Sequence, residues 1–483
     1  MKIITRGLLL LSLLMLLLVA AYTGTYAFVQ ARHERAVHLA TLKQTTFFSL
    51  AASGNKGSLE IAMQMFHSVR TMQVQVAPHF VDFLWRIRET ETPNASVLES
   101  WAGRFFPTCQ DSLCQGLSLR GLDLRGLSLS KARLAHADLG EADLRGSDLS
   151  EADLDEADLR GAKLTQTLLT GARLRYANLT NAELSKADLK NADLSDAELS
   201  GVNLQQVNLQ WAKLNRTNLT EANLAGANLY GADLRGAKLE GVTLSGATLV
   251  GVDLIGAGLI EADLRGADLQ EADLIKAKLR GAMLAGANLN AADLHQANLF
   301  QADLTQAKLA GADLFQANLV GAILVGADLH GADLGHADFS GANLRGADLT
   351  GANLAKAELS GAVIDEHTKL DEKWRLVWGI VNERGKEVRL AGANLRDAAL
   401  AGVTLEGANL KGADLSGASL RYAILTGADM TDISLQRADL HEADLEGANL
   451  AGADLSDVQG LTKEQLESAK TYKAAKLPDY LSR

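Results

Sequence analysis

The sequence contains little of what an ordinary globular core or a disulfide scaffold requires. Its 483 residues include 2 Cys, 4 Pro and only 5% aromatic residues, although 47% are hydrophobic. Two cysteines exclude a disulfide-rich small scaffold, and without a second Cys pair or a His pair at ligand spacing they exclude a cysteine-based structural zinc site. An apolar fraction made mostly of Leu and Ala favours a core in which the same small packing arrangement recurs many times, as in repeat proteins.

An excess of basic charge is also absent. The net charge of −12 excludes a general basic surface for nucleic acid or acidic lipid. Enzyme signatures are missing too, because the sequence contains no G-x-S-x-G, H-E-x-x-H, P-loop or C-x-x-C motif. We therefore expect a protein that is not an enzyme, with no catalytic residue, no cofactor and no metal site.

The N-terminus contains a long apolar run. Lys2 and Arg6 precede an apolar stretch from Gly7 to Val29, which is long enough to span a hydrocarbon core of about 30 Å. The basic residues favour an inside N-terminus and place the remaining chain across the membrane. The alternative is a cleaved signal peptide, since the Leu-rich core is about 14 residues long and small residues follow it. We expect a membrane-anchored protein with an extracytoplasmic, periplasm-like repeat domain, or a secreted protein if the signal is cleaved.

Residues 30–116 have a non-repetitive composition. Apolar residues follow helical spacing after Ser58 and again after Pro78. This pattern predicts a small α-helical segment that either packs on the first repeat coil as a cap or forms a sensory or partner-binding module. In an oxidising compartment Cys109 and Cys114 could close a small disulfide loop, and the alternative is two free thiols.

A leucine recurs at every fifth position through most of the chain. The first run extends from Leu119 to Ile364, with Phe339 as an exception, and a second run extends from Leu390 to Leu455. The residue two positions before each leucine is nearly always Ala. A period of five matches neither a helix nor a strand. The chain must therefore turn once per repeat and bury the leucine and the small residue before it each time.

These repeats read A(D/N)LxG in outline, as in residues 137–141 and 267–271, and resemble the pentapeptide repeat family. The resemblance implies an all-β solenoid, a right-handed quadrilateral β-helix in which four repeats form one coil of about 20 residues. The central Leu and the preceding Ala would fill the interior, and the other three positions would point outward. Stacked leucines and backbone hydrogen bonds between coils would stabilise it, with Gly after the turn relaxing backbone strain.

The repeat is interrupted once. Trp374, Val377, Trp378 and Val381 form a helical stripe within the interruption, and Gly385 is a plausible C-cap. We expect a helical insert that covers the exposed coil edge between two β-helical blocks. The alternatives are a hinge or a docking helix.

The C-terminus is marked by a helix start signal. Thr462 with Gln465 makes a capping box, and Leu461 can pack against Leu466. The pattern predicts a helix through about Ala475 that caps an open β-helix end, since such an end exposes unpaired strand edges.

These patterns predict six segments along the chain. They are residues 1–29 (membrane anchor or signal peptide), 30–116 (helical extracytoplasmic segment), 117–366 (first β-helix block), 367–387 (helical insert), 388–457 (second block) and 458–483 (C-terminal capping helix).

Positions 20 apart should stack, so the outer faces can be examined as ladders. One face would carry a row of carboxylates: Asp233, Asp253, Asp273, Asp293, Asp313 and Asp333. They form either a cation-binding strip or a set of acceptors, each bonded to backbone N–H groups of its own turn.

Outward apolar residues concentrate between positions 250 and 325 on adjoining faces. They are Ile255, Ile260, Ile275, Phe300, Phe315 and Val320, accompanied by His295 and Val325. A concentration of this kind is typical of a partner site. The alternative is that β-prone residues are tolerated at an outward strand position.

The favoured function is a non-enzymatic scaffold, membrane-anchored or exported, whose rigid rod binds a protein, polysaccharide or envelope partner without direct nucleic-acid contact. A homodimer through rod ends or faces is a further expectation. The resemblance implies an alternative, an acidic rod that mimics DNA, binds type II topoisomerase and protects it from quinolones. Duplex DNA carries a negative charge every ~1.7 Å, whereas the negative charges of this rod are more widely spaced and many Arg residues lie among them. Export would also separate the protein from gyrase. A third possibility is a sensory or regulatory protein that uses the rod as a spacer.

Overall fold

The structure is a computed structural model that describes residues 119–383 and 390–481. The chain divides into two compact units, Met1–Thr248 and Leu249–Arg483, which are treated separately below as the N-terminal and the C-terminal unit. Within the described ranges, no helix combines the length and the hydropathy that a bilayer crossing needs.

Several expectations lie outside the described residues. They concern the anchor or signal peptide at residues 1–29, the helical segment at 30–116, and the pairing of Cys109 with Cys114.

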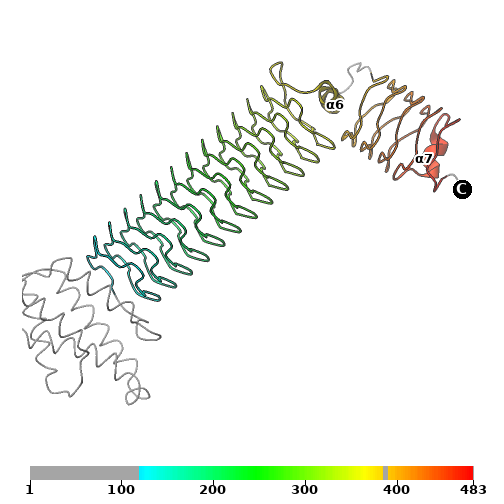
Figure 1. Ribbon diagram of the computed structural model, residues 1–483. Coiled ribbons are helices and arrows are strands. Elements are labelled where there is room, and N and C mark those ends of the chain that lie inside the picture. The colour runs from blue at the N-terminus through cyan, green and yellow to red at the C-terminus, as the bar shows by residue number, and fades with distance from the viewer. Residues whose placement is uncertain (1–118, 384–389, 482–483) are drawn as a thin grey trace, which may run out of the picture. The chain divides into compact units, whose positions relative to one another are not determined.

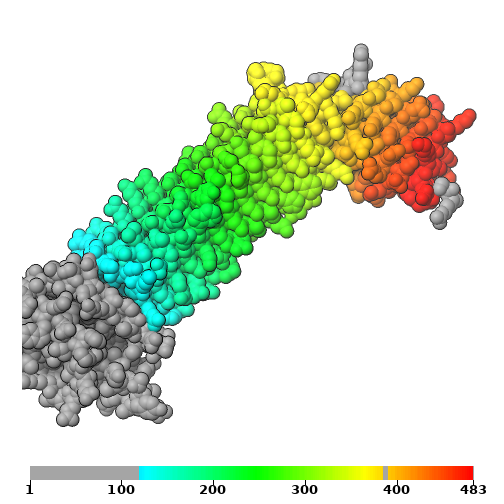
Figure 2. All heavy atoms as spheres, viewed as in Figure 1, coloured from blue at the N-terminus to red at the C-terminus, as the bar shows by residue number. Residues whose placement is uncertain are grey.

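The described repeats form a β-helical solenoid, as expected. The residue just before each central leucine makes a parallel β-bridge to the residue 20 positions further on, as in Asp253 with Asp273 and Asp273 with Asp293. Four repeats therefore complete one coil. Figure 1 shows the coils of each unit as successive turns of the ribbon, and in Figure 2 the side chains of neighbouring coils lie in contact.

Four backbone hydrogen bonds recur in most repeats, and one of them is the bond from the Asp273 N–H to the Val252 carbonyl at 2.9 Å. The Leu254 N–H donates to the Asp273 carbonyl at 2.7 Å, and the Gly256 N–H donates to the Ile275 carbonyl at 2.9 Å, so both bonds join successive coils. The Ala257 N–H donates to the Leu254 carbonyl at 2.9 Å and closes the corner. Because these bonds satisfy the peptide groups, the solenoid needs no long strands.

The second corner residue of each repeat adopts a left-handed backbone. Gly311 has a φ of 63°, a conformation that glycine adopts without steric cost. Where another residue stands at this corner, it is polar in most repeats, and the aromatic exceptions are Tyr176, Trp211 and Tyr422.

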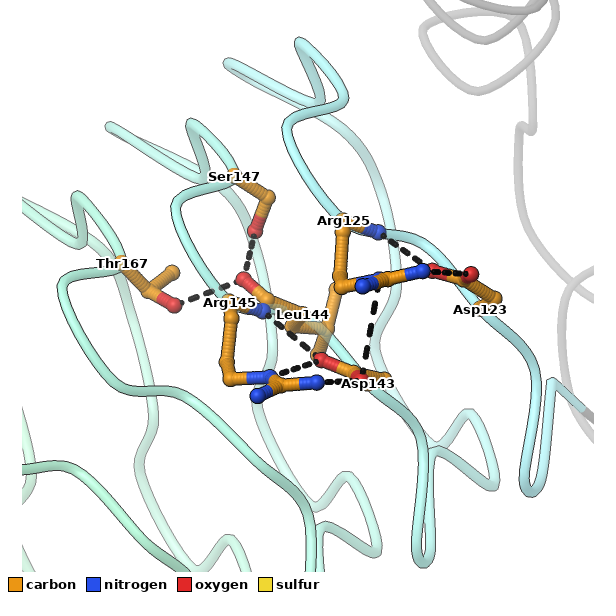
Figure 3. A network of polar contacts seen from close by, with 7 residues as sticks. All are labelled: Asp123, Arg125, Asp143, Leu144, Arg145, Ser147 and Thr167. Carbon is orange, nitrogen blue, oxygen red and sulfur yellow. Dashed lines mark hydrogen bonds and ion pairs between the residues drawn. The ribbon is translucent and has the colours of Figure 1, made fainter.

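The interior consists of the residues that the five-residue period selects. Leu254 and Ala257 are fully buried, as are nearly all their counterparts, and Phe339 fits the leucine position without exposure. Thr167 and Ser147 take the alanine position, and both hydroxyls donate to the Leu144 carbonyl at 2.7 Å (Figure 3). A buried hydroxyl is tolerated here because it finds an acceptor.

The first block continues one repeat further than Ile364. Lys369 makes a β-bridge to Asp348 and thereby stands one position later than the period of 20 requires. One inserted residue before Thr368 therefore shifts the phase. Leu390 lies in phase with Leu370, which explains why the second run of leucines does not continue the register of the first.

The insert contains the expected helix, α6, at Glu372–Asn382 (Figure 1). Its buried residues are Trp374, Val377 and Ile380. Trp378 is half-buried, and its indole Nε1 donates to the Ala362 carbonyl at 2.7 Å. Of the expected stripe, Trp374 and Val377 are buried and Trp378 and Val381 are half-buried, and Ile380 is buried in addition. Gly385 lies outside the described residues.

α6 also satisfies backbone groups of the last coils. The Asn382 side-chain nitrogen donates to the Leu359 carbonyl at 2.9 Å, and its oxygen accepts from the Gly361 N–H at 2.6 Å. The Arg375 guanidinium donates to the Thr368 carbonyl at 2.5 Å. Without these side chains, the backbone groups of Leu359, Gly361 and Thr368 would lack a hydrogen-bond partner from a following coil.

The C-terminal helix, α7, spans Lys463–Ser468 and has the expected capping box between Thr462 and Gln465. Gln465 also donates to the Leu440 carbonyl at 3.0 Å and to the Ala443 carbonyl at 2.7 Å. The helix thus bonds to the last coils.

The expectation of a helix through about Ala475 was wrong. Ala469 is extended, Thr471 makes a β-bridge to Asn449, and Lys476 makes one to Asp454. After α7 the chain again pairs with the preceding coil, because Thr471 and Lys476, five residues apart, bridge to Asn449 and Asp454, which are also five apart.

Candidate functional site

The aspartates of the predicted ladder are bonded to their own turns. In the C-terminal unit, Asp273 Oδ1 accepts from the Ile275 N–H at 3.1 Å, and Asp313 Oδ1 accepts from the Phe315 N–H at 2.8 Å. The same bond recurs at Asp253, Asp293 and Asp333. The hydrogen-bond alternative is confirmed, and these carboxylates position the first corner residue. Within residues 119–383 and 390–481, no three His, Cys, Asp or Glu side chains are grouped to hold a metal.

Several aspartates, including Asp233 of this ladder, are neutralised by an arginine two residues later. Arg125 Nε donates to Asp123 Oδ1 at 2.8 Å and Nη2 donates to Oδ2 at 2.6 Å, and Arg145 repeats this geometry on Asp143 (Figure 3). These bonds lower the pKa of both carboxyls below their usual range. Such bidentate pairs are the stronger kind of surface ion pair.

The same pairing occurs in other coils and in both units. It joins Asp158 with Arg160, Asp233 with Arg235, and Asp263 with Arg265. The sequence signal is the tripeptide Asp-Leu-Arg, whose outer residues lie on one side of the coil. The pairing was not among the sequence-based expectations, although the tripeptide was visible in the sequence.

One group of the predicted apolar residues forms a ladder along a corner. Ile255, Ile275, His295 and Phe315 occupy the first corner position of successive coils. The rings of His295 and Phe315 are nearly parallel, with centroids 5.4 Å apart and an interplanar angle of 4°. The corner therefore carries a continuous apolar and aromatic edge.

A glycine in the next coil makes room for the Phe315 ring. A Cβ atom at Gly335 would lie 2.9 Å from Cδ2 of Phe315, closer than real Cβ atoms approach. On the same side, Phe315 meets the His336 ring edge-on at 5.2 Å. The ring is thus held at the surface by defined contacts, with its N–H bonded to Asp313.

The other predicted residues lie at the next corner. Ile260, Phe300 and Val320 follow the ladder of Ile255 and Phe315 by one repeat. Polar residues, including Asn298 and Asn318, occupy the face between the two corners. The structure therefore brings the predicted residues to the two edges of one face, all six half-buried, and not into a single continuous patch.

The two most exposed apolar residues of this region are not among the predicted ones. Met283 is 38% exposed and Ile323 is 41% exposed. Both occupy the outward position before the leucine, where Asp or Asn usually stands, on the face that begins at the corner of Phe300 and Val320. An apolar residue at this usually polar position was the sequence signal that could have identified them. Met283, Ile323, Phe300 and Val320, with Val325 at the far corner of the same face, form what we call the apolar face, which Asp303 interrupts between Met283 and Ile323.

The five-residue repeat of this chain is matched by the family description "Pentapeptide repeats". The matched segments are residues 109–145, 128–166, 167–206, 203–241, 237–274, 257–296, 267–306, 297–335, 327–365, 393–432 and 433–459. The chain belongs to the pentapeptide repeat family.

Solved structures include similar pentapeptide repeat proteins. HetL from the cyanobacterium Nostoc sp. strain PCC 7120, described as involved in heterocyst differentiation regulation, is 32% identical, with 58% of this chain and 100% of that chain covered and a TM-score of 0.22. Rfr23 from the cyanobacterium Cyanothece 51142 is 33% identical, with 25% and 91% covered and a TM-score of 0.22. QnrB1, a plasmid-mediated fluoroquinolone resistance protein, is 20% identical, with 44% and 90% covered and a TM-score of 0.20. No curated protein matches the chain.

One ion pair of this pentapeptide repeat protein titrates far from its ordinary range. The Lys369 ammonium donates to Asp348 Oδ2 at 2.8 Å and lowers the pKa of Asp348 from 3.8 to about 2, assisted by hydrogen bonds from Thr350. A carboxyl whose pKa is lowered on folding stabilises the folded state above its unfolded pKa, and this contribution is lost as the pH falls through the folded value.

We expect Lys369→Gln to reduce stability at neutral pH and to reduce it less at acid pH. The gap in urea midpoint between wild type and variant should be constant above about pH 5 and close between about pH 4 and pH 2. Lys278→Gln, at the same outward position of another coil, is the matched control and should show no such closing gap. A gap for Lys369→Gln that does not change with pH would contradict the assignment.

Proposed function

We propose that this pentapeptide repeat protein is a non-enzymatic scaffold whose β-helix binds a protein partner in the C-terminal unit. The observation that carries the proposal is the group of outward apolar side chains between Ile255 and Val325, at positions that are polar in most coils. In the same coils, the polar face that carries Asn298 and Asn318 separates the apolar face from the Phe315 ladder, by which we mean Ile255, Ile275, His295 and Phe315.

The geometry of the Phe315 ladder supports a binding role over tolerance of β-prone residues. Asp313 fixes the backbone of Phe315, His295 stacks on its ring, and Gly335 leaves the space that the ring occupies. Aromatic side chains that are already ordered lose little conformational freedom on binding, and they are common among the residues that dominate binding energy.

The scaffold role is favoured over DNA mimicry by the state of the surface charges. Aspartates such as Asp123, Asp233 and Asp263 are each paired with an arginine of the same repeat. A DNA mimic depends on a dense series of uncompensated negative charges. A sensory role that uses the β-helix as a spacer, and a homodimer through the ends or faces of the β-helix, would both be compatible with the same surfaces.

We also propose that the scaffold acts outside the cytoplasm. The support is the sequence of residues 1–29, in which Lys2 and Arg6 precede an apolar run. The partner is then a protein or another component of the cell envelope.

Replacing Ile275 and Phe315 by Asp should abolish capture of the partner. A carboxylate at either corner position would be desolvated in the complex without a counter-charge. The measurement is a pull-down from envelope extracts with the full-length chain, quantified for wild type and variants, with thermal unfolding as a folding check. Ala310→Asp, at the first corner position of another side, is the control and should retain the partner. Equal capture by all variants would show that the apolar residues are merely tolerated.

Cell fractionation tests the compartment. We expect the full-length chain outside the cytosol, in the membrane pellet after alkaline extraction if the anchor is retained, and in the soluble exported fraction if it is cleaved. The double variant Leu14→Arg, Leu17→Arg should remain in the cytosol, because two charges interrupt the apolar run. Recovery of the wild-type chain from the cytosol would overturn the export proposal.

A further inference from the structure

Two exposed aromatic side chains lie together at one corner of the N-terminal unit. Trp211 is 53% exposed and Tyr230 is 42% exposed. Their ring centroids are 5.1 Å apart and their planes meet at 82°. The Trp211 N–H donates to the Tyr230 carbonyl at 3.0 Å, so the pairing of successive coils fixes the two residues side by side.

The local backbone disfavours a tryptophan at this position. Trp211 has a φ of 59°, in the left-handed region where a bulky residue is an outlier. Its ring also needs a glycine in the next coil, since a Cβ atom at Gly231 would lie 2.3 Å from Cζ3 of the indole. Burial does not explain the residue, because most of its surface remains in solvent. The combination indicates a ring that is kept at the surface for contact with a ligand.

The surroundings of the pair are polar. Asn191 precedes Trp211 by one coil, and Gln210 precedes Tyr230 by one coil, in the same ladders. The adjoining face presents Lys213. A protein interface usually has a fully buried apolar core, whereas within the N-terminal unit the positions of this corner that come before the two rings carry Lys190, Asn191 and Gln210. The arrangement therefore differs from the apolar face of the C-terminal unit and requires a ligand that is itself part apolar and part polar.

We propose that Trp211 and Tyr230 form a carbohydrate-binding site for a polysaccharide of pyranose units. The ring face of a pyranose presents C–H groups with slight positive charge, which pack on the negative face of an aromatic ring. Its edge presents hydroxyls, which donate to and accept from amides such as those of Asn191 and Gln210. Two rings at right angles provide a floor and a wall for one sugar unit, and the neighbouring coils provide polar side chains along the chain direction.

This inference rests on the proposed role of the β-helix as a binding scaffold, and it names one class of envelope ligand. It uses a different compact unit from the Phe315 ladder. Loss of carbohydrate binding in a Trp211 variant is therefore separable from loss of the protein partner in the Ile275 and Phe315 variants.

The test is cosedimentation of the full-length chain with insoluble chitin and cellulose, both β-linked pyranose polymers, and titration with their soluble hexasaccharides. The test variant is Trp211→Asn, because asparagine tolerates the left-handed backbone and removes the ring. The matched control is Tyr422→Asn, since Tyr422 has the same φ of 59° and the same exposure of 53%. Thermal unfolding of all three proteins checks the fold.

We expect wild type and Tyr422→Asn to bind at least one polymer equally, and Trp211→Asn to bind it about tenfold more weakly, or about 1.4 kcal/mol. Failure of the wild-type chain to bind any of the polymers and hexasaccharides would overturn the proposal. Equal binding by Trp211→Asn would overturn it as well. Loss of a captured protein by Trp211→Asn, without any carbohydrate binding by wild type, would assign the corner to a protein interface instead.

Discussion

The structure depends on the burial of one leucine in every five residues. A leucine at this interval can face a common interior only if the chain turns after each one, and the left-handed second corner residue makes that turn. Leu254 and its counterparts are completely buried, and each coil presents the same backbone groups to the next. Burial of apolar surface and satisfaction of the peptide groups are thereby achieved by one repeated geometry.

Because the inward residues alone form the core, the outward positions have no role in it. Some serve the fold locally, as when Asp313 bonds the following corner or Arg145 pairs with Asp143. Others are residues for which the fold offers no reason, such as Ile323 on a face and Trp211 on a corner. A binding protein built in this way would locate its contacts in the exceptions to the repeat, since a ladder of identical polar residues cannot distinguish one part of the solenoid from another.

Much of the fold could be predicted because it depends on residue spacing. The inward leucines and alanines, the bonded aspartates and the capping box at Thr462 follow from local pattern. The end of α7 at Ser468 could not be predicted, because pairing of Thr471 with the preceding coil competes with helix continuation. The bond of the Trp378 indole to the Ala362 carbonyl likewise could not be predicted, because only the assembled coil supplies that acceptor.

The candidate surface was predicted in its residues and not in its arrangement. Sequence shows that Phe300 and Phe315 point outward, but the face between their corners becomes evident only when the four repeats of a coil are closed. Met283 was overlooked because it lies on a different face from the aspartate row that was examined, at a position where Asp or Asn usually stands. The 20-residue spacing of Trp211 and Gly231 predicts that they stack, but the approach of the indole to the space beside the glycine becomes evident only from the side-chain positions.

The most direct test of the account compares two internal deletions of different length. Removing residues 287–291 deletes one complete repeat, whereas removing residues 287–289 deletes fewer residues and disrupts the period. If the five-residue period determines the fold, the larger deletion should unfold cooperatively at a melting temperature close to wild type, and the smaller one should melt clearly lower. The contradicting result is a three-residue deletion that is as stable as the five-residue deletion.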